Sequence, residues 1–236
     1  VGAWRTDASG PMQVVSGPIG HTRVHYEAPR AQRLEVEMQA FLNWFDDSTI
    51  SCDPIIKAGL AHLWFVTIHP FDDGNGRIAR AITDLALARS EQSAQRFYSM
   101  SSQVRAERKT YYDMLETTQK GTLDVSAWLK WFLACLDRAF DRAETILASV
   151  LQKARFWEAH SGHQFNERQR AILNRLLDGF EGKLTSSKWA KLAKCSQDTA
   201  LRDIDDLLAH DILIKDQAGG RSTSYSLVFP PTGPAP

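Results

Sequence analysis

The stretch DPIIKAGLAHLWFVTIHPFDDGNGRIAR, residues 53–80, places two helices around a loop of unusual composition. Asp53 before Pro54 is the pattern of a helix N-cap followed by a first-turn proline. The segment IIKAGLAHLWFVTI is apolar on nearly every face, which predicts a helix at the centre of the core. RIARAITDLALARS is helical again, so Gly74, Asn75 and Gly76 are expected where this second helix begins.

The sequence around this stretch predicts a mainly α fold. Residues 12–27 alternate around a Gly17-Pro18-Ile19-Gly20 turn and are typical of a β-hairpin. Further helices are expected in ERKTYYDMLETTQKG and from Asp124 to about His160. A helix is also expected after Pro29, and its core-facing stripe would hold Leu34, Met38, Phe41, Leu42 and Phe45.

The region after residue 166 has the element order of a winged helix-turn-helix domain. Helices are expected in ERQRAILNRLLDGF, SSKWAKLAKC and SQDTALRDIDDLLAHD, followed by a hairpin that turns at Gly219-Gly220. We therefore predict four parts: residues 1–150, a junction at 151–165, a winged helix at 166–229 and a disordered tail at 230–236.

Length and charge narrow the class of protein. The 236 residues suffice for one large or two modest domains. Basic and acidic residues balance at 28 each, which excludes a global field that would draw the chain to nucleic acid or to an anionic membrane. The sequence contains no apolar run of about 18 residues, which is the length that would indicate a membrane span. The three cysteines are few and far apart, as is typical of reduced thiols, and predict a cytoplasmic protein.

The loop HPFDDGNGR, residues 69–77, carries the chemistry of a phosphate site. Backbone N–H groups at a helix start have no intrahelical partner, and the glycines let them converge on an anion. Asp73 supplies a hard oxygen for Mg²⁺, and His69 can act as a general base near neutral pH. Each residue alone has an ordinary structural explanation, but together they suit a nucleotide phosphate, a metal and a hydroxyl nucleophile.

Residues 69–80 fit H-x-F-x-[DE]-G-N-G-R-x-x-R at every specified position, and in this they resemble the Fic family. VHYEAP also resembles the family's substrate-docking flap, and HLWFVTIHPF resembles its central helix, so the resemblance covers about residues 5–145. It implies a Fic helical core with a β-hairpin flap. It also implies a protein adenylyltransferase that moves AMP from ATP to a hydroxyl side chain of a target protein, or of itself, and releases pyrophosphate.

The resemblance implies a role for each residue of the motif. His69 would take the proton of the attacking hydroxyl, and Asp73 would hold Mg²⁺. The anion hole would consist of Gly74, Asn75 and Gly76, with Asn75 on the α-phosphate, and the β- and γ-phosphates would be held by Arg77 and Arg80.

The resemblance also extends to the segment YYDMLETTQKG. It puts Tyr111 at a position that contacts adenine, although a half-buried core tyrosine explains this residue equally well. Gln119 falls where some relatives have Asn. Some family members move other groups, and the Doc branch phosphorylates, but the intact Gly74 favours AMP transfer. Transfer of another nucleotide remains the alternative within this class.

Fic enzymes are commonly restrained by a helix with the pattern [ST]-x-x-x-E-[GN]. Here the glutamate that precedes a glycine is Glu181, and Leu177 stands four residues before it, so the pattern is absent. We expect the restraining helix to lie upstream of Val1, or on a partner chain. We also expect this chain to be more active than a longer form that contains the helix.

A different class of function would place the activity in the C-terminal region. From residue 166 to 227 there are 10 basic and 9 acidic residues, and the expected recognition helix holds Arg202 against Asp198, Asp203, Asp205 and Asp206. These acids oppose DNA binding, whereas Arg221, Lys188, Lys191 and Lys194 favour it. We favour protein interaction, and the alternative is a nucleotide-sensing regulator that acts through the winged helix. A homodimer is also compatible with the family resemblance.

Two further histidine patterns have ordinary explanations. His62, in the apolar helix, is expected to be a hydrogen-bonded core histidine. His160 and His163 form an H-x-x-H pair without nearby acids or cysteines, which is more typical of a loop than of a metal site.

Overall fold

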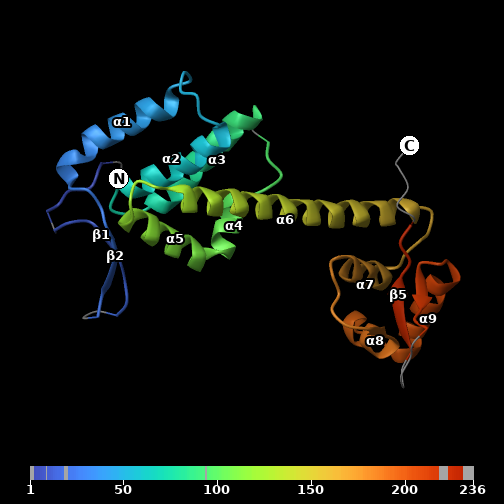
Figure 1. Cartoon of the computed structure of the whole chain (residues 1–236). Coiled ribbons are helices and arrows are strands. Elements are labelled where there is room, and N and C mark those ends of the chain that lie inside the picture. The colour runs from blue at the N-terminus through green and yellow to red at the C-terminus, as the bar shows by residue number, and fades with distance from the viewer. Residues whose placement is uncertain (1–2, 9, 19–20, 94, 218–222, 231–236) are drawn as a thin grey trace. The chain divides into compact units, whose positions relative to one another are not determined.

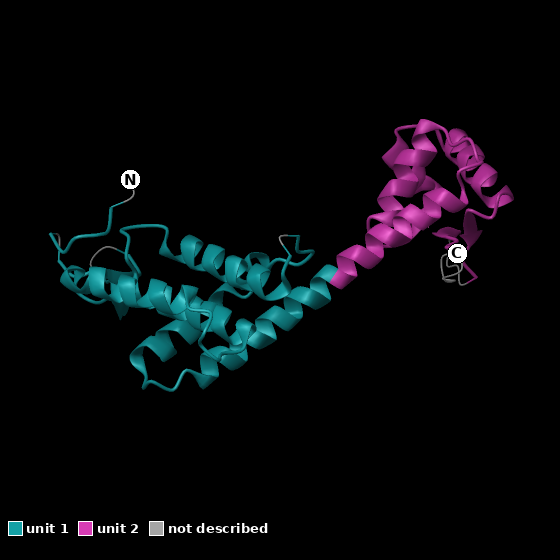
Figure 2. Ribbon diagram, turned by 90° about the horizontal axis from the view of Figure 1, so that it is seen from above, with its two compact units in different colours: residues 1–143 teal, residues 144–236 magenta. Residues whose placement is uncertain are grey.

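The computed structural model describes residues 3–8, 10–18, 21–93, 95–217 and 223–230, and most of them are helical (Figure 1). The predicted mainly α class is therefore confirmed. The chain divides into two compact units, residues 1–143 and 144–236, and the boundary falls inside one long helix (Figure 2). The four-part division predicted above stays a prediction. No helix among the described residues is both long enough and apolar enough to cross a lipid bilayer.

The first unit begins with the predicted hairpin. Strands β1 (Gln13–Ser16) and β2 (Arg23–Glu27) pair antiparallel, and part of the predicted turn between them lies outside the described residues. Val14 pairs with Tyr26, but Val15 pairs with Val24, so His25 is an extra residue on β2. This bulge interrupts the ladder and changes where the strand directs its side chains.

Helix α1 (Leu34–Asp46) follows a short 3-10 turn (Ala31–Arg33) and buries one stripe of side chains. The buried members are Leu34, Met38, Phe41 and Phe45. Our placement of Leu42 on this stripe was wrong, because its side chain is 44% exposed. At 100° per residue, Leu42 lies about 80° around the helix from Leu34, beyond the edge of the contact.

Helix α2 (Pro54–Ile68) is the centre of the first unit, as predicted. The Asp53 side chain accepts hydrogen bonds from the N–H groups of Ile55 and Ile56, which confirms the expected N-cap. Helix α3 (Asn75–Glu91) packs along α2 (Figure 1). The unit continues with α4 (Met100–Ala106), α5 (Arg108–Lys120) and α6 (Ser126–Ala159), whose C-terminal half lies in the second unit.

His62 is buried inside α2, and the prediction of a hydrogen-bonded core histidine is confirmed. The Thr83 hydroxyl donates to a backbone oxygen, so it accepts from Nδ1–H of His62 at 2.8 Å. Nε2 then accepts from the Tyr111 hydroxyl at 2.9 Å. Burial, helped by the charge of Arg80, lowers the pKa of His62 from 6.5 to about 3.

This buried neutral imidazole is expected to make the protein acid-sensitive. Between pH 6.5 and about pH 3 the unfolded chain binds a proton at His62 that the folded chain does not, so stability falls as pH falls through this window. The expected loss approaches about 1.4 kcal/mol per pH unit. Urea unfolding of wild type and His62→Gln at several pH values checks it: the variant should show the shallower pH dependence, and equal slopes would contradict the prediction.

The second unit holds the predicted helices and hairpin, with one strand that the sequence did not reveal. Its helices are α7 (Glu167–Leu177), α8 (Ser186–Ala193) and α9 (Gln197–Ala209). Strands β4 (Leu213–Lys215) and β5 (Ser224–Leu227) form the hairpin, whose expected turn at Gly219-Gly220 lies outside the described residues. The two-residue strand β3 (Leu184–Thr185) pairs with β5 and gives the sheet the order β3-β5-β4.

The acids of α9 do not all face solvent. This corrects the expectation that all four aspartates of this helix oppose DNA binding. Asp203 is buried, and both its oxygens accept from the Arg168 guanidinium at 2.8 and 2.9 Å. Asp206 accepts from Gln169 Nε2 at 2.7 Å. Because both carboxylates face α7, they repel an external phosphate less than a simple charge count indicates.

Candidate active site

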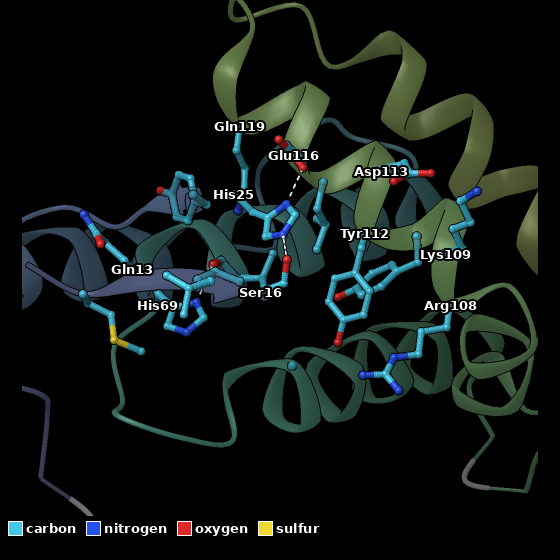
Figure 3. A pocket seen from close by; sticks show the side chains of 18 of the residues that line it. Gln13, Ser16, His25, His69, Arg108, Lys109, Tyr112, Asp113, Glu116 and Gln119 are labelled. Carbon is cyan, nitrogen blue, oxygen red and sulfur yellow. Dashed lines mark hydrogen bonds and ion pairs between the residues drawn. The ribbon is translucent and has the colours of Figure 1, made fainter. Parts of the chain in front are cut away.

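The motif loop opens into a cleft of about 670 Å³ in the first unit. Its walls come from the hairpin, the C-terminal end of α2, the first turns of α3 and one face of α5 (Figure 3). Of the predicted site residues, the cleft brings together His69, Gly76, Arg80 and Tyr111. A cleft of this size, with an apolar wall and a few convergent polar groups, suits a small-molecule ligand.

His69 lies at the C-terminal end of α2 with its backbone in the left-handed region, at φ 51°. A residue other than glycine adopts this conformation at a cost of about 1–3 kcal/mol and only where its surroundings hold it there. The Nδ1 atom lies 3.2 Å from the Val66 carbonyl oxygen, so it carries the ring proton and donates to that oxygen. The lone pair of the neutral ring is therefore on Nε2.

The surroundings of His69 keep the imidazole neutral. Burial is the main cause that lowers its pKa below 6.5, and the positive charge of Arg5 acts in the same direction. The hydrogen bond to Val66 opposes the shift but does not reverse it. A neutral ring with a free lone pair at pH 7 is the form that a general base requires.

Arg5, in the N-terminal segment, positions His69, a role that sequence analysis missed. Its Nε donates to the His69 carbonyl oxygen at 2.8 Å, its guanidinium also contacts the Pro29 carbonyl, and its backbone N–H donates to Pro70 at 2.9 Å. The side chain is almost completely buried and pairs with Asp7 at 3.1 Å. An arginine that binds backbone carbonyls 24 and 64 residues away has no local sequence pattern by which it could be recognised.

The loop between α2 and α3 is held in shape by Asn75. Its Oδ1 accepts from Phe71 N–H at 3.0 Å, and its Nδ2 donates to the Phe71 carbonyl at 2.6 Å. The side chain is 2% exposed. The loop thus engages both the oxygen and the nitrogen of this amide, and the backbone N–H of Asn75 at the start of α3 is available to a ligand.

The N-terminus of α3 has the properties of an anion site. Gly74 is its N-cap with φ 89°, a left-handed conformation that glycine adopts without steric cost. The first N–H groups of the helix, at Asn75 and Gly76, lack intrahelical partners and lie at the positive end of the helix dipole. These groups can bind a phosphate oxygen without any side chain.

Asp73 and Arg77 form an exposed ion pair one turn apart. Asp73 Oδ2 lies 2.9 Å from Arg77 Nη2, and Oδ1 accepts from Gly74 N–H at 2.6 Å. The two side chains are 91% and 72% exposed, so this pair contributes little to stability and separates readily. Both groups are therefore accessible to other partners, the carboxylate to a cation and the guanidinium to a phosphate.

A second cleft of about 550 Å³ adjoins the first and is strongly basic. Four arginines line it, Arg77, Arg80, Arg105 and Arg108. Arg80 also lines the first cleft. Such a concentration of guanidinium groups beside the start of α3 suits a ligand with several phosphate groups.

Tyr111 and Gln119, on α5, both line the first cleft. Tyr111 is 3% exposed, and burial raises the pKa of its hydroxyl, which donates to His62. Burial and this hydrogen bond are enough to explain Tyr111 as a core residue. Its contact with adenine stays a prediction. Gln119 Nε2 donates to Thr67 Oγ1 at 3.1 Å.

The hairpin is tied to α5 by a chain of polar side chains (Figure 3). Ser16 Oγ lies 2.5 Å from His25 Nε2, and His25 Nδ1 lies 2.6 Å from Glu116 Oε2. Glu116 also accepts from Arg23 and Lys120, each at 2.8 Å. The hydrogen bond from His25, followed by those from Lys120 and Arg23, lowers the pKa of Glu116 to about 2. The bulge in β2 brings His25 to this position.

Comparison with known proteins finds similarity to one family. Residues 2–87 match the model of the Fic/DOC family. Over 81 residues the chain is 41% identical to "Protein adenylyltransferase fic-1" of Caenorhabditis briggsae, which covers 33% of this chain and 16% of the relative. Over 132 residues it is 28% identical to "Protein adenylyltransferase Fic" of Culex quinquefasciatus, which covers 54% of this chain and 25% of the relative. The chain thus spans a quarter or less of the length of these relatives.

A solved structure of a Fic family protein from Desulfovibrio desulfuricans G20 is also similar, with a TM-score of 0.46 and 21% sequence identity. That comparison covers 89% of this chain and 59% of the solved one.

Proposed function

We propose, from the match of residues 2–87 to the Fic/DOC family model, that this chain is a protein adenylyltransferase that transfers AMP from ATP to a hydroxyl side chain of a target protein. The observation that carries the proposal is that His69, with its Nε2 lone pair, lines the same cleft as Gly76 at the start of α3. A base and an anion site within one cleft are the two parts that transfer of a phosphate group to a hydroxyl requires.

In the proposed reaction, His69 Nε2 takes the proton of the target hydroxyl as its oxygen attacks the α-phosphorus of ATP. A new P–O bond forms, the bond between the α-phosphorus and the bridging oxygen breaks, and pyrophosphate leaves with its electron pair. The N–H groups of Asn75 and Gly76 would bind the α-phosphate oxygens, where charge accumulates. Arg77 and Arg80, which line the basic cleft, would hold the β- and γ-phosphates.

The residues present fit a Mg²⁺ ion, which we include in the proposal. Asp73 is a highly exposed carboxylate at the edge of the phosphate site. Mg²⁺ usually binds through one or two carboxylates together with substrate phosphates. The ion would neutralise phosphate charge, and Asp73 would exchange its contact with Arg77 for the cation, which frees Arg77 for a phosphate.

Replacing Asp73 by asparagine is therefore expected to weaken Mg²⁺ binding while leaving the loop folded, because the amide oxygen can still accept from Gly74. The dependence of the AMP transfer rate on Mg²⁺ concentration measures this effect, and the half-saturating concentration should rise by at least about tenfold. An unchanged Mg²⁺ dependence would contradict the role of Asp73.

The proposed activity is tested by mass spectrometry of the purified chain after incubation with ATP and Mg²⁺. Self-modification serves as the readout, and a gain equal to one adenylyl group supports the proposal. A gain with UTP, CTP or GTP instead would keep the mechanism and change the donor. If no nucleotide gives a gain, even with candidate target proteins, but ATP still binds, the nucleotide-sensing regulator becomes the better hypothesis.

The partners and the location belong to the proposal as well. The hairpin offers strand edges beside the cleft, where an extended target segment can add as a further strand.

The helices and three-stranded sheet of the second unit support a winged helix, which we assign to protein interaction rather than to DNA binding. Cys52, Cys135 and Cys195 are all free thiols, which supports a cytoplasmic location. A homodimer and a restraining helix outside residues 1–236 stay predictions.

A further inference from the structure

The second unit brings together two histidines and an acid that are distant in the sequence. His163 lies in the segment between α6 and α7, while Asp206 and His210 lie one turn apart at the C-terminal end of α9. Each residue offers one ligand atom, and these atoms all lie within 4.8 Å of one another. We propose that His163, Asp206 and His210 form a binding site for a divalent transition-metal ion of the Zn²⁺ type.

The two separations between a histidine and the carboxylate are close to those around a tetrahedral ion. Zn²⁺ binds histidine nitrogen and carboxylate oxygen at about 2.0–2.2 Å, so two ligand atoms on a tetrahedron are about 3.3–3.5 Å apart. His163 Nε2 lies 3.3 Å from Asp206 Oδ2, and His210 Nδ1 lies 3.4 Å from Asp206 Oδ1. Each imidazole thus lies beside a different oxygen of the carboxylate, and an ion bound between them would draw the three ligand atoms closer than the 4.8 Å within which they now lie.

His163 has an unsatisfied nitrogen at this point. Its Nε2 is buried and makes no hydrogen bond within the described part of the chain, although it faces a carboxylate oxygen. The ring is packed edge-on against Phe165, with the ring centres 4.5 Å apart, which limits its rotation. A metal ion would give this nitrogen a partner. The nitrogen binds a metal through its lone pair, whereas it could form a hydrogen bond to the carboxylate only by carrying a proton.

Neighbouring groups hold the carboxylate in position. Gln169 Nε2 donates to Asp206 Oδ2 at 2.7 Å, and Gln169 is itself fixed by the capping box that it forms with Asn166. Carboxylate ligands of metals are commonly oriented by such second contacts. His210 Nδ1 lies 2.8 Å from the Asp206 carbonyl oxygen, a contact that it gives up when this nitrogen takes the ion.

The ligand set selects the class of ion. Two imidazoles and one carboxylate suit Zn²⁺, Cu²⁺ or Ni²⁺, whereas Mg²⁺ and Ca²⁺ prefer oxygen ligands alone. The side chains of Asp206 and His210 are 40% and 54% exposed, so solvent reaches the site and water can complete the tetrahedron. Such an ion would tie the segment before α7 to the end of α9.

The test uses the whole chain, freed of any affinity tag and stripped with a chelator. Zn²⁺ is titrated by calorimetry, and Co²⁺ is added separately because tetrahedral Co²⁺ absorbs in the visible range. We expect one saturable Zn²⁺ site and a tetrahedral Co²⁺ spectrum. Asp206→Asn and His210→Gln should each weaken binding by more than about 100-fold. The titration is repeated after alkylation of the cysteines, which removes binding by free thiols.

Matched variants separate the site from general surface binding. Asp205→Asn changes an exposed neighbour on α9, and His21→Gln changes an exposed histidine of the first unit; both should bind Zn²⁺ like wild type. If Asp206→Asn is not folded by circular dichroism, His163→Gln takes its place. No saturable site, or a site that survives in His163→Gln and His210→Gln, would overturn the proposal.

Discussion

Replacing His69 by alanine is expected to lower the rate of AMP transfer by about 10²–10⁴-fold, the usual contribution of a general base. The hydroxyl would then lose its proton to water, while the start of α3 and the arginines would still hold the nucleotide. The binding of ATP should therefore change little. Transfer is measured as the gain in mass with ATP and Mg²⁺, and nucleotide binding is measured in parallel by calorimetry.

Asp72→Ala is the matched control for this experiment. Asp72 is an exposed acid three residues from His69 on the same loop, at a position that the motif leaves variable. Its replacement should leave transfer unchanged. Loss of transfer in both variants would show that the loop, and not the imidazole, is responsible, and full activity of His69→Ala would exclude the base role.

The pH dependence of the wild type gives a second measure of His69. Because burial lowers the pKa of this imidazole below 6.5, the base stays neutral as pH falls through that value. The acid limb of the kcat/KM profile should therefore lie below pH 6.5. A limb above pH 6.5 would mean that another group acts as the base.

Asn75→Ala is expected to damage both the fold and the activity. The substitution leaves the N–H and C=O of Phe71 without their side-chain partners, and it opens a cavity at a position that is 2% exposed. A buried group left without its hydrogen bond costs about 1–3 kcal/mol in the free energy of unfolding. Transfer should also fall, by at least about tenfold, because the loop sets the positions of both His69 and the start of α3.

Urea unfolding and transfer assays measure the two effects of Asn75→Ala separately. Asn43→Ala is the control, since Asn43 is an exposed amide on α1 that bonds only to Gln39 among the described residues. Its effect on stability should stay within about 0.5 kcal/mol. Normal stability of Asn75→Ala would contradict the structural role of the amide.

The parts of the site that were predictable from the sequence are those formed by neighbouring residues. The Asp53-Pro54 cap, the apolar body of α2 and the glycines at the start of α3 all act within one or two turns of the chain. Local chemistry therefore determined where the two helices end and where the loop lies between them.

The remaining features depend on contacts between distant segments, which no local pattern records. Arg5 reaches the His69 carbonyl across 64 residues, and Asp203 meets Arg168 across 35. Strand β3 has only two residues, too few for an alternating pattern. The proposed metal site could not be recognised in the sequence for the same reason: Asp206 comes near His163 only when α9 folds against the segment before α7.

The shortness of β1 has a consequence for the solubility of the protein at high concentration. Its four residues offer an edge of about 13 Å, and the bulge at His25 interrupts the ladder beside it. Long, flat edges favour pairing between identical chains, which leads to aggregation. An edge this short is long enough to hold a few residues of a guest segment, but it is a poor template for the growth of fibrils.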